Sequence, residues 1–169
     1  MSPPQSGQSV GAPDSLAQQP LLLVMPVVIE RLEELKATVK GLPVAALNMA
    51  LDRVGTVHST RFVILEDEQG RWAKLIVVAI YDGTVPHYIS AFARELKLAF
   101  NTLFEFVADK PPLPVEDHVD EFIAYVESHD VPSANGETYR ANPGLTVLDI
   151  WEAMSRGAAA PVLAPPSQP

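Results

Sequence analysis

The sequence of 169 residues contains no cysteine. Without thiols the chain has no disulfide, no cysteine nucleophile, no zinc–thiolate centre and no iron–sulfur cluster. The lack of disulfides is typical of a cytoplasmic protein, and we expect that location. The four histidines show no H-x-x-x-H, H-x-H or E-x-x-H spacing, so the sequence predicts no bound metal.

Positive charge is also scarce, because 12 Lys and Arg face 21 Asp and Glu, which leaves a net charge of −9. Nucleic-acid binding needs clustered cations that displace phosphate counterions, and no run of Lys or Arg exists, so we expect no nucleic-acid partner. The longest apolar run, 21–29, contains Pro26 and is shorter than the roughly 20 residues of a membrane helix. It follows a leader without a basic residue, so we expect neither a signal peptide nor a membrane anchor.

Proline is abundant, and its distribution divides the chain. Eight of the 16 prolines lie in residues 1–20 and 161–169. Such segments bury too little apolar surface to offset the entropy of ordering. We therefore expect a disordered Pro-rich tail at 1–20, one α+β domain at 21–156, and a disordered Ala/Pro-rich tail at 157–169.

Within the domain, the hydrophobic pattern changes between strand spacing and helix spacing. The predicted strands are 21–28, 58–65, 73–81 and 137–141. The predicted helices are 29–40, 43–54, 85–107, 115–129 and 146–154. Once the additional helices are set aside, the order is βαββαβ, which is the ferredoxin-like unit. We therefore expect an α+β fold with a four-stranded antiparallel sheet and helices on one face.

The second face of this sheet is also expected to be apolar. Along strand 58–65, Phe62 and Ile64 share one face, while Val63 and Leu65 share the other. A large apolar face is rarely left in water. A twofold homodimer that stacks sheet on sheet would cover it, so we expect a dimeric α+β barrel.

The candidate site lies on the hairpin formed by the second and third strands. His58, Arg61 and Asp82 are the candidate catalytic residues, with His58 as an acid–base group and Arg61 as a clamp for an anion or propionate. The structural alternative is an Arg61–Asp82 ion pair with His58 as a strand-end residue. Five aromatic side chains are expected to line a ligand cavity between sheet and helices: Phe62, Tyr81, Tyr88, Phe92 and Tyr139.

Three short motifs carry a family resemblance: His58-x-x-Arg61-Phe62-Val63, Tyr81-Asp82-Gly83 and Tyr139-x-Ala141-x-Pro143-Gly144. Together they resemble an uncharacterised bacterial family with a ferredoxin-like, dimeric α+β barrel core. That family is related in style to domains found with dye-decolourising peroxidases and catalase-like haem proteins. The resemblance covers 21–156 and implies a redox-enzyme partner and haem as a cofactor. The G-x-x-D-G motif of the peroxidases is incomplete, since Ala79 stands at its first glycine.

Two functions are compatible with these observations. The first is a non-catalytic, accessory dimeric module of a peroxidase or haem system, which predicts a collapsed cavity packed by Phe62, Phe92, Leu96 and Phe100. The alternative is a small peroxidase- or monooxygenase-like oxidoreductase acting on an aromatic or haem-type ligand. It predicts a sheet–helix cavity of about 300 Å³ or more.

Overall fold

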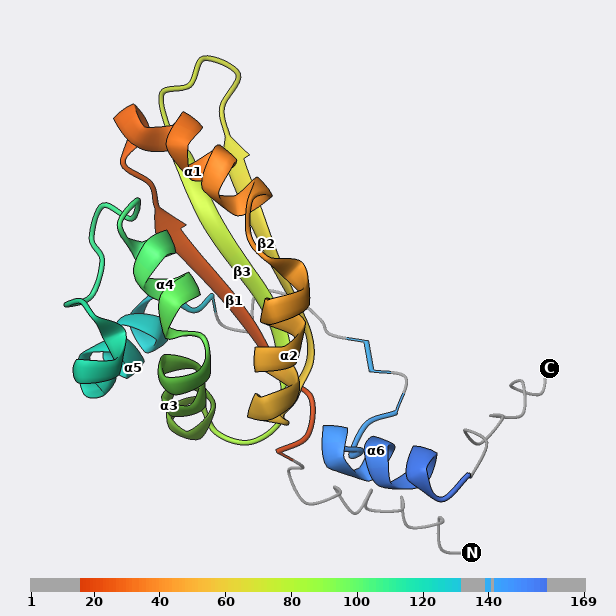
Figure 1. The fold of residues 1–169 in the computed structure, drawn as a ribbon. Helices are drawn as coiled ribbons and strands as arrows, with labels where there is room; N and C mark the ends of the chain where they lie inside the picture. Colours follow the sequence, from red (N-terminus) through yellow and green to blue (C-terminus); the bar gives the residue numbers. More distant parts are fainter. Residues whose placement is uncertain (1–15, 132–138, 141, 158–169) are drawn as a thin grey trace, which may run out of the picture.

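The computed structural model describes residues 16–131, 139–140 and 142–157. These residues form an α+β fold in which helices lie over an antiparallel sheet (Figure 1). The predicted α+β class with an antiparallel sheet is therefore confirmed. The expected tails at 1–15 and 158–169 lie outside the described residues. The described fold begins at Leu16, five residues before the domain boundary that we expected.

The sheet contains three strands among the described residues: β1 (Gln19–Pro26), β2 (Val57–Glu66) and β3 (Ala73–Tyr81). The strand order is β1–β3–β2, and β3 is antiparallel to both neighbours. β1 and β2 are thus parallel and separated by β3, as in a split βαβ unit. The fourth predicted strand, 137–141, lies outside the described residues except for Tyr139 and Arg140, neither of which is in a strand.

In the part of the chain that the structure describes, six α-helices and two short 3-10 segments connect or follow the strands. Their bounds are η1 (Ile29–Arg31), α1 (Leu32–Lys40), α2 (Val44–Val54), α3 (Val85–Glu95), α4 (Lys97–Phe104), η2 (Val115–Asp117), α5 (Val119–His129) and α6 (Val147–Ser155).

The single helix predicted over 85–107 is wrong, because the chain breaks into α3 and α4 at Leu96. Leu96 leaves helical geometry, with φ −114° and ψ 16°. Its amide still bonds Phe92 O, and its carbonyl accepts from Phe100 N. The break allows Phe92 on α3 and Phe100 on α4 both to be buried. Periodicity alone did not show it, since the apolar spacing continues through Leu96.

One core holds the helices on the sheet. Along β3, Leu75, Val77, Ala79 and Tyr81 alternate with more exposed residues and are buried beneath the helices. The period of two identifies the helix-covered face of the sheet. The alternate residues of all three strands form the opposite face, here called the open face, and several of them remain exposed.

In the part of the chain that the structure describes, no helix has the length and apolar character needed to span a membrane.

Candidate functional site

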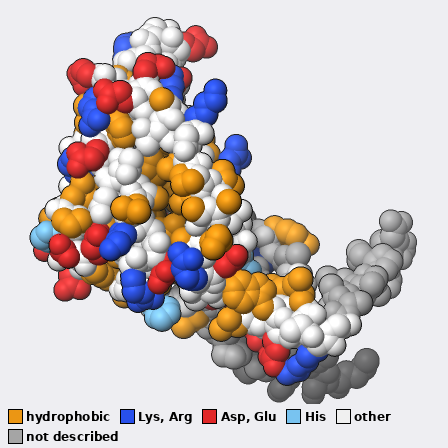
Figure 2. Space-filling model, in the orientation of Figure 1, with side chains coloured by type: hydrophobic (Ala, Val, Ile, Leu, Met, Phe, Trp, Pro, Cys, Tyr) orange, Lys and Arg blue, Asp and Glu red, His pale blue; other side chains and the backbone are white. Residues whose placement is uncertain are grey.

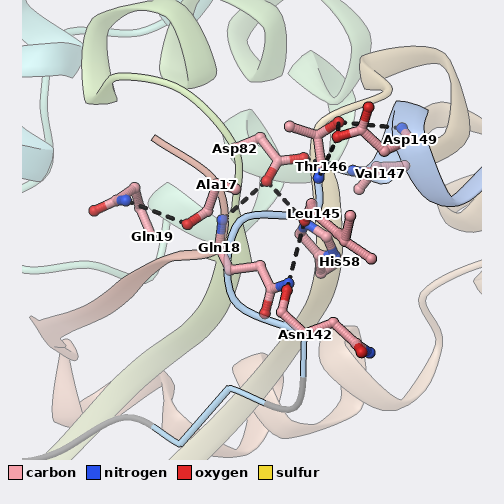
Figure 3. Close-up of polar contacts among 10 residues, drawn as sticks. All are labelled: Ala17, Gln18, Gln19, His58, Asp82, Asn142, Leu145, Thr146, Val147 and Asp149. Carbon is pink, nitrogen blue, oxygen red and sulfur yellow. Dashed lines mark hydrogen bonds and ion pairs between the residues drawn. The ribbon is translucent and has the colours of Figure 1, made fainter. Parts of the chain in front are cut away.

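Asp82 is the only charged residue in the described structure that is buried, with 6% of its surface exposed. It follows β3 directly, and its carboxylate accepts hydrogen bonds from three other parts of the chain (Figure 3). Oδ1 accepts from Gln18 N at 2.9 Å and lies 2.8 Å from His58 Nε2. Oδ2 accepts from Val147 N at 2.7 Å. Both oxygens are therefore engaged, as a buried carboxylate requires.

The local backbone explains how Asp82 reaches these donors. The pairing of β2 with β3 is irregular between Val57 and Ser59, so His58 is inserted at the strand end beside Asp82. The Asp82 amide donates to Thr56 O at 2.8 Å, which holds the two strand ends together. Gly83 has φ 95°, a conformation that L side chains rarely adopt. This glycine turns the chain out of β3 immediately after the carboxylate.

The same carboxylate fixes the beginning of α6. Val147 is the first residue of that helix, whose leading amides lack partners within the helix. Asp82 supplies an acceptor and a negative charge there, which also complements the helix dipole. Thr146 and Asp149 add a capping box at the same helix end. Hydrogen bonding to Thr146 lowers the pKa of the Asp149 carboxyl.

The N-terminal segment is tied to the same place. Gln18 donates its backbone amide to Asp82 and its side-chain Nε2 to Asn142 O, at 2.6 Å, and to Leu145 O, at 3.2 Å. Ala17 is buried beside it. The segment before β1 and the segment before α6 are thus joined through one glutamine. This arrangement explains why residues 16–20 belong to the fold.

His58 has a defined environment. Its side chain is 15% exposed, and its Nε2 is held by Asp82. It lines a cavity of about 260 Å³ together with Asp52, Ile150 and Trp151. A carboxylate that holds one imidazole nitrogen fixes the ring orientation. The two amides that share this carboxylate show that it also joins the backbone of distant segments.

Arg61 does not join this site. It pairs with Val78 across β2 and β3, lies on the open face and is exposed. The structural alternative of an Arg61–Asp82 ion pair is wrong, because His58 and two backbone amides occupy the carboxylate instead. Arg61 makes no hydrogen bond or ion pair with any other residue that the structure describes.

Three of the expected cavity residues, Tyr81, Tyr88 and Phe92, pack against one another in the core. Tyr81 stacks on Tyr88 with ring centroids 4.1 Å apart. The ring centroids of Tyr88 and Phe92 are 4.3 Å apart, and those of Phe92 and Phe100 are 5.6 Å apart. Phe62, half-buried on β2, packs against the same core. Burial raises the pKa of the Tyr88 hydroxyl, so this tyrosine stays neutral.

Tyr139 is not part of this aromatic cluster, since 91% of its surface is exposed. We expected it on a fourth strand beside the cavity. It is described instead outside any strand, next to residues 132–138, which lie outside the described part of the chain.

The described residues do not fit haem between sheet and helices. The aromatic rings occupy that space, and the cavities bordering β2 measure about 270 Å³ and 260 Å³. Ligand pockets usually begin at roughly 300 Å³. In the ranges that the structure describes, no group of three His, Asp or Glu side chains is placed to hold a metal ion.

Sequence reasoning brought His58 and Asp82 together but missed the backbone donors of Gln18 and Val147. A backbone amide donor has no residue signature, so residue types do not indicate either contact. Comparison with known proteins adds no assignment, because no family model, curated protein or solved structure matches the chain.

Proposed function

We propose that the protein is a non-catalytic dimeric α+β module in which two copies pair through the open face of the sheet. One observation carries the proposal: both faces of the sheet bear apolar side chains, and the helices that the structure describes cover only one of them. The open face consists of neighbouring cross-strand rows, Leu22–Val78–Arg61, Val24–Ile76–Val63 and Pro20–Ile80–Ser59. Leu22 is 37% exposed and Val78 is 40% exposed.

The size and continuity of this face favour pairing over exposure to water. Its central strand contributes Ile76, Val78 and Ile80, and the flanking strands add Val24 and Val63. Contiguous apolar patches of this kind mark interaction sites. A sheet face is self-complementary under a twofold axis, so a second copy is the occupant that the chain itself provides.

The site geometry supports a non-catalytic role. The Asp82 carboxylate is used by backbone donors, Arg61 lies on another face, and aromatic rings fill the expected cavity. The engaged Asp82 carboxylate and the packed aromatic rings support the accessory hypothesis.

A ferredoxin-like sheet is part of the same proposal. The order β1–β3–β2 leaves the outer edge of β1 for a fourth strand. Val131 N already donates to Leu22 O at 2.9 Å along that edge, and Leu23 forms an antiparallel bridge with Asp130. The resemblance stated above makes a redox enzyme the partner class that this module would serve.

The oligomeric state tests the proposal directly. We expect the full chain to sediment at twice the 18.3 kDa of one copy. Val78→Glu places a charge at the centre of the open face and should give monomers. Val44→Glu, at a 66% exposed position on α2, is the matched control and should remain dimeric. A monomeric wild type, or two variants of equal mass, would refute the pairing.

Catalysis is tested separately. Turnover of aromatic donors with peroxide, or with oxygen and a reductant, should equal the rate without protein. Turnover that is lost in His58→Ala and kept in His87→Ala would establish the oxidoreductase alternative.

A further inference from the structure

A pocket lies where α6 meets the end of α2 and the beginning of β2. Its volume is about 260 Å³, and the residues that line it are Asp52, Val57, His58, Val147, Ile150 and Trp151. We call this space the α6 pocket. Figure 2 shows hydrophobic side chains gathered over the beginning of α6, beside the rest of the fold. Sites for drug-sized molecules measure roughly 300–1,000 Å³, so a ligand of the α6 pocket is smaller than these.

His58 gives the pocket an unused hydrogen-bond acceptor. Its Nε2 lies 2.8 Å from Asp82 Oδ1, and a carboxylate only accepts hydrogen bonds, so Nε2 carries a proton. In the neutral imidazole, Nδ1 then keeps its lone pair. Nδ1 makes no hydrogen bond to any residue that the structure describes, and it is not buried. An accessible acceptor therefore lies on a ring whose orientation Asp82 fixes.

Asp52 gives the pocket a second unused acceptor, which is an anion. Its side chain is exposed and has no hydrogen bond or ion pair with the residues that the structure describes. The neighbouring Arg53 pairs with Glu95 instead, at 3.0 Å. Two acceptors that line one pocket thus both lack a donor.

The remaining features of the pocket favour a positive charge. Trp151 lines it and is 42% exposed, and the face of an indole ring attracts cations. Among the described residues that line the pocket, none is Lys or Arg. Arg156, which follows α6, is paired with Glu152. The net charge of −9 adds to the attraction for a cationic ligand.

We infer that the α6 pocket binds a small primary amine that carries a short apolar or aromatic group. A protonated primary amine has three N–H donors and no acceptor, so it supplies the donors that His58 Nδ1 and Asp52 lack. Its charge is attracted to the Trp151 ring. Its apolar group contacts the aliphatic side chains that line the pocket.

Titration calorimetry of the full-length protein with phenethylamine tests this inference. We expect saturable binding of one phenethylamine per chain at neutral pH. Phenethyl alcohol has the same ring and chain but a hydroxyl in place of the ammonium, and it should bind roughly tenfold more weakly. No saturable phenethylamine binding, or equal affinity for the two compounds, would overturn the assignment.

NMR locates the site with a control inside the same molecule. The chain has two tryptophans: Trp151 lines the pocket, and Trp72 lies in the turn between β2 and β3. Phenethylamine should shift the indole N–H signal of Trp151 until binding saturates and leave the signal of Trp72 in place. Trp151→Phe assigns the two signals. Equal shifts of both signals, or a shift of the Trp72 signal alone, would refute the location.

Asp52→Asn removes the charge and keeps the shape of the side chain, so phenethylamine affinity should fall roughly fivefold. Asp120→Asn on α5 is the matched control, because Asp120 is also exposed and the substitution changes the net charge equally, but Asp120 does not line the pocket. Both variants should unfold at the wild-type temperature, which separates loss of binding from loss of folding. Equal affinities of the two variants would refute the role of Asp52.

These tests are independent of the proposed dimer. None of the residues that line the α6 pocket belongs to the cross-strand rows of the open face. A monomeric protein would therefore refute the pairing and leave phenethylamine binding as expected.

Discussion

The backbone amide of Val147 donates to the carboxylate of Asp82 at 2.7 Å, across 65 residues of chain. The same carboxylate binds Gln18 N and His58 Nε2. One buried acid thus joins the segment before β1, the first residues of β2 and the first turn of α6. Buried carboxylates are costly unless their acceptors are used, so Asp82 is stable here because all its partners are present.

Replacing Asp82 with Asn should destabilise the protein by about 3 kcal/mol, because an amide has one acceptor oxygen and its NH₂ group would face donors. Urea denaturation measures the loss. Hydrogen exchange should also accelerate at the α6 amides, which lose their link to β3.

Asp52→Asn is the control for that substitution. Asp52 is exposed and makes no hydrogen bond or ion pair with the residues that the structure describes. The free energy of unfolding of the Asp52→Asn variant should differ from that of the wild type by less than about 0.5 kcal/mol. Equal effects of the two substitutions would contradict the role assigned to Asp82.

Tyr88→Phe should raise stability by about 1 kcal/mol, because the Tyr88 hydroxyl is buried without a hydrogen-bond partner among the described residues. The stacking on Tyr81 is retained. Tyr125→Phe is the matched comparison, since its hydroxyl donates to Asp109 at 3.2 Å. That variant should lose about 1 kcal/mol. Thermal unfolding distinguishes the two, and a Tyr88→Phe protein that melts lower than the wild type would disprove the prediction.

Asp130→Asn should stabilise the protein at pH 7. Burial raises the pKa of the Asp130 carboxyl, against a smaller opposing effect of its hydrogen bond from Leu22 N. The folded state therefore holds this proton to higher pH than the unfolded state does. Stability falls as pH rises through that interval, and the charged form carries the cost above it.

The asparagine oxygen can still accept from Leu22 N. The advantage of Asp130→Asn over the wild type should thus be present at pH 7 and vanish at pH 3, where Asp130 is protonated in both states. Urea midpoints at the two pH values provide the comparison. A stability advantage of Asp130→Asn that is larger at pH 3 than at pH 7 would contradict a raised pKa of the Asp130 carboxyl.

Haemin should not bind saturably to the purified protein, because Tyr81, Tyr88 and Phe92 occupy the space between sheet and helices. Visible absorption during a haemin titration measures whether binding saturates. The contrary outcome is a saturable Soret band that disappears in His58→Ala and persists in His87→Ala.

The strands were accessible from sequence because their periodicity is a local property. β3 runs from Ala73 to Tyr81, as expected from its alternation, and β2 extends the expected 58–65 by one residue at each end. His58 and Asp82 were grouped correctly, since a hairpin brings the ends of its strands together. The irregular pairing at the start of β2 sets Val57 opposite Tyr81 and leaves His58 without a paired residue on β3.

The errors involve interactions between distant segments. Arg61 was the obvious charge partner for Asp82 by residue type, but strand alternation places it on the opposite face, and backbone amides compete for the acid. The break at Leu96 is a consequence of packing two aromatic faces against one core, which apolar spacing cannot reveal.

The long reach of Asp82 also affects the order in which a growing chain can fold. During synthesis, β1, β2 and β3 emerge with the carboxylate, Gln18 and His58 already available, but the Val147 amide comes 65 residues later. Contacts of high sequence separation slow folding. A chain that ends before Val147 therefore lacks the backbone donor of Asp82 Oδ2, so its free carboxylate oxygen must be met by water.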